Sequence, residues 1–70
     1  MTLKDLKPVL SASTANLYVF REEDLSHPVF IHKFDLDRKD FDDLEVSCLE
    51  RGVDYITIDL IPPNLTEVYN

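Results

Sequence analysis

The clearest pattern in the chain is a strict alternation of side chains near its C-terminal end. Over residues 55–60 (Tyr-Ile-Thr-Ile-Asp-Leu), each apolar aliphatic side chain follows a polar or aromatic one. A period of two is typical of a strand in a sheet that buries one face. The pattern predicts a strand over residues 54–61, which ends at Pro62-Pro63 because proline cannot donate a ladder hydrogen bond.

Two earlier segments also favour strands. Residues 16–22 (Asn-Leu-Tyr-Val-Phe-Arg-Glu) and 28–35 (Pro-Val-Phe-Ile-His-Lys-Phe-Asp) are rich in aromatic and β-branched residues. The five residues between them are the right number for a hairpin loop, so we expect antiparallel pairing.

The N-terminus predicts a short helix. Thr2 can act as the N-cap, with Asp5 three positions on as a loose capping box. Apolar side chains within residues 3–10 fall on one helical face. Pro8 lies beyond the first turn, where it kinks or ends a helix, so we expect the helix to run at most from Leu3 to Leu10.

A second, acidic helix is expected after the first hairpin. Asp37 can cap it, and Asp40 lies at its third position, where acids are favoured near the positive end of a helix. Phe41 and Leu44 would form its buried face.

The end of this helix is open to two interpretations. In one, the helix is short and residues 45–49 form a strand that turns through residues 50–52 into the last strand. In the other, the helix continues until Gly52 stops it. We favour the strand, because a helix would leave Val46 on its polar side and because Gly52 can supply the left-handed residue of a tight hairpin.

These elements predict a single small α+β domain over residues 1–61. Its order is a short N-terminal helix, a β-hairpin, a short acidic helix and a second β-hairpin; the alternative is α-β-β-α-β with a longer second helix. Residues 62–70 are expected to form an extended C-terminal tail. The 70 residues suffice for one domain, and the single cysteine excludes an internal disulfide.

The charge balance is acidic. Fourteen acidic and seven basic side chains give a net charge of −7, which argues against nucleic acid as a direct ligand. Residues 35–50 hold seven of the acids and two of the bases, a patch that can attract a basic protein surface or keep the chain soluble. Charges near the N-terminus and the lack of a long apolar run predict a cytoplasmic protein that does not contact a membrane.

Three segments together resemble the short, acidic, mostly uncharacterised proteins that phages and prophages of Gram-positive bacteria encode. They are residues 1–6 (Met-Thr-Leu-Lys-Asp-Leu), 40–46 (Asp-Phe-Asp-Asp-Leu-Glu-Val) and 54–60 (Asp-Tyr-Ile-Thr-Ile-Asp-Leu). The resemblance lies in the residue pattern and the order of elements, and it departs from the usual pattern at Pro8 and in the tail. It implies a location in the host-cell cytoplasm and a binding role, and it carries no catalytic residue.

No catalytic, metal or cofactor site is predicted. Residues 35–40 begin like a calcium loop, but the sixth position lacks glycine and the twelfth is Val46 instead of a bidentate glutamate. His27 and His32 are five apart, an odd separation that sends them to opposite faces of a strand. Cys48 is expected to be a small apolar core residue.

The first hairpin carries apolar side chains on both faces, which one short helix cannot cover. Either a second helix covers the aromatic face or that face binds a partner, commonly a second copy of the chain. His32 would be partly buried on this face. The aromatic residues predicted to share it are Tyr18, Phe20, Phe30 and Phe34.

These features predict a small non-enzymatic protein-binding module. We expect a homodimer whose interface includes Tyr18, Phe20 or Phe30. The alternative is an acidic inhibitor that mimics nucleic acid and occupies the basic groove of a host or defence enzyme. The residues that would bind that groove are Asp40, Asp42 and Asp43.

Overall fold

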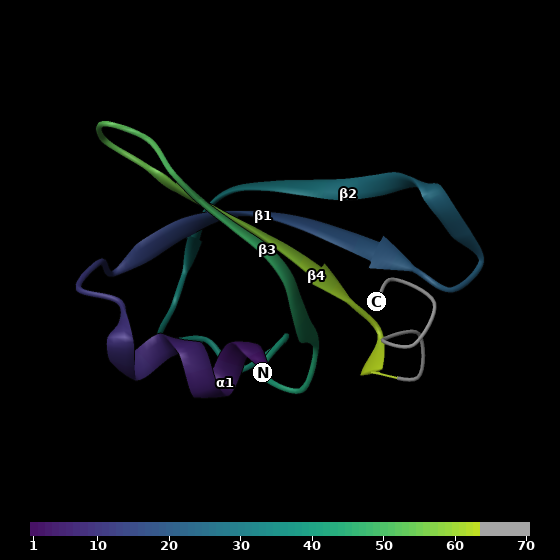
Figure 1. Cartoon of the computed structure of the whole chain (residues 1–70), viewed down its shortest axis with the longest axis horizontal. Coiled ribbons are helices and arrows are strands. Elements are labelled where there is room, and N and C mark those ends of the chain that lie inside the picture. The colour runs from purple at the N-terminus through teal and green to yellow at the C-terminus, as the bar shows by residue number, and fades with distance from the viewer. Residues whose placement is uncertain (64–70) are drawn as a thin grey trace.

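A four-stranded mixed sheet dominates the computed structural model, which describes residues 1–63 (Figure 1). The strands lie in the order β2-β1-β4-β3. The central strands β1 and β4 are parallel, and each pairs with an outer strand in antiparallel fashion. The predicted tail lies outside the described residues from position 64 on. The strand bounds are β1 (Thr14–Arg21), β2 (Asp24–Asp35), β3 (Glu45–Arg51) and β4 (Ile56–Ile61).

The predicted N-terminal helix is confirmed. Helix α1 (Leu3–Leu6) continues into a 3-10 helix, η1 (Lys7–Val9), which contains Pro8. Thr2 and Asp5 form the predicted capping box: the Thr2 hydroxyl accepts from the Asp5 N–H, and the Asp5 carboxylate accepts from the Thr2 N–H, both at 3.3 Å. The proline removes a backbone donor, and the chain tightens and then leaves the helix.

The core lies between one face of the sheet, here called the inner face, and the N-terminal segment. Figure 1 shows α1 on this side of the sheet, together with the connection from β2 to β3. Phe41 and Leu44 of that connection pack against the core as partly buried side chains. The buried members of the core are Leu3, Leu6, Leu10, Ala15, Leu17, Val19, Phe34, Leu36, Ile58 and Leu60.

The first residues of the chain pair with the start of β3. The Leu3 N–H donates to the Leu44 carbonyl at 2.9 Å, and the Val46 N–H donates to the Met1 carbonyl at 2.8 Å. The N-terminal ammonium lies 2.9 Å from the Glu45 carboxylate. The N-terminal segment is therefore tied to the sheet edge as well as to the core.

The predicted second helix is wrong, and so is the alternative with a longer one. Residues 36–44 form a series of turns that carries the chain from the β2 edge of the sheet to the β3 edge. Three inter-strand spacings require about 14 Å. A helix made of all nine residues would be about 13 Å long. No residues would then remain to lead the chain from β2 to the level of the helix below the sheet and back up to β3. The fold is mostly sheet with one short N-terminal helix.

The first hairpin is antiparallel, as predicted, but its details differ. β2 begins at Asp24, so the turn is the two residues Glu22 and Glu23 instead of a five-residue loop. A bulge interrupts the pairing of the two strands near Lys33, whose φ is 52°. The Asn16 side-chain oxygen accepts from the Lys33 N–H at 3.0 Å. The bulge shifts the alternation of β2 and turns Phe34 to the inner face, where it is buried, contrary to prediction.

The second hairpin follows the favoured interpretation, with a strand over residues 45–51. Gly52, however, does not adopt a left-handed conformation. Its N–H donates to the Tyr55 carbonyl at 2.8 Å, and a Cβ at position 52 would lie 2.2 Å from the Tyr55 ring. A side chain at position 52 would therefore require the exposed Tyr55 ring to move aside.

Candidate functional site

One row of side chains crosses all four strands on the face of the sheet opposite α1, here called the outer face. Tyr18 on β1 pairs with Phe30 on β2 and with Asp59 on β4. Asp59 in turn pairs with Cys48 on β3. Their neighbours along the central strands, such as Leu17, are buried in the core, so alternation places the row on the outer face.

Aromatic rings form one end of this row. The ring centroids of Tyr18 and Phe30 lie 4.9 Å apart with an interplanar angle of 41°, within the range of a favourable aromatic pair. His32 lies next, 6.2 Å from Phe30. Tyr18 is 38% exposed and Phe30 is 50% exposed. Phe20, two residues beyond Tyr18 on β1, is half-buried.

The structure brings together the sequence-predicted aromatic residues, with two differences. Phe34 leaves this face because of the bulge at Lys33. His32 is exposed, whereas it was predicted to be partly buried. A partner can therefore reach the imidazole of His32 as well as the two rings.

The centre of the row holds a carboxylate that sequence reasoning missed. Asp59 is half-buried on a central strand, and burial raises the pKa of its carboxyl, with a further increase from the charge of Glu50 on β3. Within the described part of the chain, neither acid has a cation or a hydrogen-bond donor as partner. The sequence did contain one sign of this site: an aspartate within a predicted strand is unusual, because acids are depleted from strand interiors.

The last member of the row is Cys48, which is exposed. This corrects the prediction that it is a core residue. The bulge between Val46 and Cys48 places the thiol opposite Asp59 on the outer face. Local sequence gave no sign of it, because the bulge shifts the alternation by one residue.

The three acids predicted for a nucleic-acid mimic do not form one free surface. Asp42 is half-buried in an ion pair with Lys7, whose ammonium also donates to the Arg38 carbonyl at 2.6 Å. Asp40 pairs with the Arg38 guanidinium. Asp43 is exposed. Asp42 therefore helps to hold the connection against η1.

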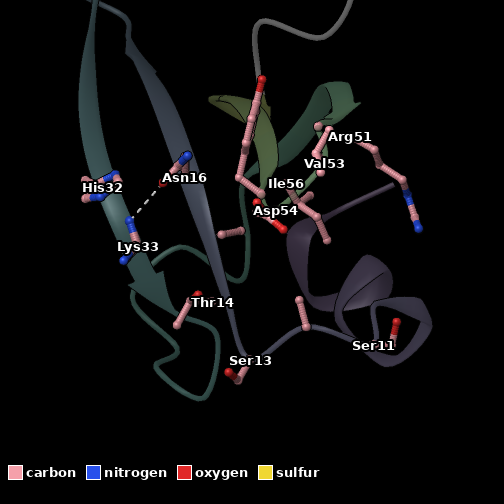
Figure 2. Close-up of a pocket in the computed structure, with 14 residues that line it drawn as sticks. Ser11, Ser13, Thr14, Asn16, His32, Lys33, Arg51, Val53, Asp54 and Ile56 are labelled. Atoms are coloured by element: carbon pink, nitrogen blue, oxygen red, sulfur yellow. Dashed lines mark hydrogen bonds between the residues drawn. The ribbon is translucent and has the colours of Figure 1, made fainter.

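A groove of about 500 Å³ lies beside the start of β1, between the bulge of β2 and the β3–β4 loop (Figure 2). Its lining includes Lys33 and Arg51, which suggests an anion site. Figure 2 shows these two cations on opposite sides of the groove, with the Asp54 carboxylate between them in the view. The cations do not converge on one point, so the groove has no built anion site.

Within residues 1–63, no three side chains of the metal-ligating types gather in a way that could hold an ion. No helix in that range has the length and apolar character needed to cross a bilayer.

Comparison of the chain with known protein families, with curated proteins and with solved structures finds no match. Evidence for the function therefore comes from the chemistry of the outer face.

Proposed function

We propose that the protein is a non-enzymatic protein-binding module that binds its target through the outer face. Its place of action is the cytoplasm of a host cell, as for the phage and prophage proteins that it resembles. The observation that supports the proposal is the exposed Tyr18–Phe30 pair on a face that no described helix or connection covers (Figure 1). Exposed aromatic residues are enriched at the centres of protein interfaces.

The charge of this face favours protein over nucleic acid as the ligand. Nucleic acids also stack on aromatic rings of open sheets, but such sites carry basic side chains for the phosphates. Here Asp59 lies beside Tyr18, Glu50 lies diagonally across from Asp59 on β3, and the chain carries a net charge of −7. The mimic hypothesis has less support, because Asp40 and Asp42 already pair with cations of the same chain.

The test is site-specific photo-crosslinking in cells. A photoreactive phenylalanine analogue replaces Phe30 in one variant and Val9, an exposed residue of η1, in a matched control. We expect the analogue at position 30 to capture one defined protein, and Tyr18→Ser in the same chain to abolish the capture. Equal capture from position 9, or capture from position 30 that survives Tyr18→Ser, would argue against the outer face.

A further inference from the structure

The outer face places an aromatic ring and two carboxylates within reach of one partner side chain. Tyr18 and Asp59 are register partners on adjacent parallel strands, whose spacing is about 4.8 Å. Glu50 pairs with Thr57, two residues before Asp59 on the same strand, so its Cβ lies diagonally about 7 Å from that of Asp59. A single guanidinium can therefore lie over the ring and meet a carboxylate oxygen at its edge.

The two carboxylates lack compensation in the described chain. The basic groups that form ion pairs in the described chain do so with acids other than Asp59 and Glu50. Lys7 binds Asp42, and Arg38 binds Asp40. The N-terminus binds Glu45. Arg21 and His27 pair with acids in or beside the β1–β2 turn. The half-buried Asp59 is thus kept beside the like charge of Glu50, an arrangement that a cation from a partner would relieve.

Charge complementarity also argues against the occupant that the sequence favoured, a second copy. A two-fold contact through the outer face would bury Asp59 and Glu50 of each chain against an identical acidic face. Each chain brings a net charge of −7. Like charges that face each other in an interface are strongly unfavourable.

We propose that the outer face binds a basic protein segment, with one arginine side chain of that segment stacked on Tyr18, paired with Asp59 and attracted by the nearby charge of Glu50. Arginine fits better than lysine, because its planar guanidinium stacks on a ring and still donates hydrogen bonds at its edge. The proposal rests on the proposed function and specifies the chemistry of the partner.

The experiment titrates the isotope-labelled full chain with a blocked pentapeptide, acetyl-Leu-Gly-Arg-Gly-Leu-amide, and follows backbone amide shifts. The control peptide carries citrulline, the neutral isostere of arginine. We expect shifts centred on Tyr18, Asp59 and Glu50, and an affinity about fivefold weaker for the citrulline peptide, the size of an exposed cation–π or ion-pair contact. Asp59→Asn should weaken arginine binding by a similar factor, whereas Asp54→Asn, the same charge change in the β3–β4 loop, should leave it unchanged.

Three results would overturn the proposal: shifts centred on another surface or none at all, equal affinity for both peptides, or a dimer that Phe30→Ser dissociates. Its failure is separable from failure of the proposed function. If crosslinking at position 30 captures a protein whose binding is insensitive to Asp59→Asn, the outer face remains a binding surface and the arginine contact is wrong. If crosslinking at position 30 captures nothing, the proposed function itself fails.

Discussion

Two residues, Lys33 and Asp59, occupy positions that their own preferences disfavour. Lys33 has a positive φ, which costs a non-glycine residue about 1–2 kcal/mol. Its strain is offset by the hydrogen bond from its N–H to Asn16 and by the burial of Phe34 that the bulge permits. Asp59 is an acid on a central strand beside another acid, and nothing in the described chain offsets it. An uncompensated cost of this kind is typical of a functional position.

The raised pKa of Asp59 predicts a pH dependence of stability. Burial and the charge of Glu50 raise this pKa above the ordinary 3.8, so the folded chain holds the proton more tightly than the unfolded chain. The free energy of unfolding then falls as pH rises from 3.8 through the raised pKa, and the full penalty applies above it. Tyr18 and Cys48, which flank Asp59, are the other titratable side chains paired with it.

Asp59→Asn removes this penalty. We expect the variant to be more stable than wild type at neutral pH and to lose that advantage as the pH falls toward about 3.8. Urea unfolding between pH 3 and pH 8 measures the difference, with Asp54→Asn as the control for a change in net charge. Lower stability of Asp59→Asn at neutral pH would show that the carboxylate is satisfied in the folded state.

At the scale of elements, the N-terminal segment is fixed to the sheet by both core packing and backbone hydrogen bonds. Helix α1 has four residues, too few to be stable alone. It is held by the full burial of Leu3 and by hydrogen bonds that residues 1–4 share with residues 42–46. The connection over residues 36–44 is held in turn by the Lys7–Asp42 ion pair.

Leu3→Ala should therefore destabilise the whole domain. Loss of this buried side chain is expected to cost about 2–5 kcal/mol, because it leaves a cavity beneath the sheet. A domain of this length has a free energy of unfolding of only about 4–10 kcal/mol, so the variant should lose a large part of it. Val9→Ala, at a 68% exposed position of η1, should change stability by less than about 0.5 kcal/mol. Denaturant unfolding of both variants checks this; equal effects would mean that α1 does not pack as described.

At the scale of the whole molecule, residues 1–63 form a sheet of which the described elements cover one face. A chain of about 70 residues buries only about 60% of the surface that it exposes when unfolded. Here that burial is concentrated between the inner face and the N-terminal segment. The outer face, with Tyr18, Phe30 and Cys48, stays accessible in the described chain.

Alkylation of the only thiol should report this one-sided packing. We expect Cys48 to react with iodoacetamide in the folded protein at a rate within about tenfold of that in denaturant, since no unfolding is required. In the matched control, Cys48→Ser combined with Ala15→Cys, the thiol moves to the inner face, where position 15 is 3% exposed. That thiol should react only through opening of the fold. Strong native protection of Cys48 would mean that its face is covered in solution.

Local patterns in the sequence determined the N-terminal cap, the two hairpins and the alternation of β4. Each of these depends on residues only a few positions apart: Thr2 with Asp5, or the apolar side chains of residues 55–60 with one another. The same patterns put Tyr18 and Phe30 on one face of the first hairpin, although the tighter turn and the bulges set which residues pair. Half of the candidate site was therefore predictable from sequence.

The tertiary structure alone decided the strand order, the path of residues 36–44 and the composition of the outer face. The parallel pairing of β1 with β4 joins residues about 40 positions apart, and it is this pairing that sets Asp59 beside Tyr18. The acidic segment favoured a helix locally, but the need to cross the sheet overrode it. The bulges then moved Phe34 inward and Cys48 outward. Secondary-structure propensity depends on residues close together in the chain, whereas strand register and the covering of a sheet face depend on contacts between distant segments. The half of the proposed site that contains Asp59 and Glu50 could therefore be identified only from the fold.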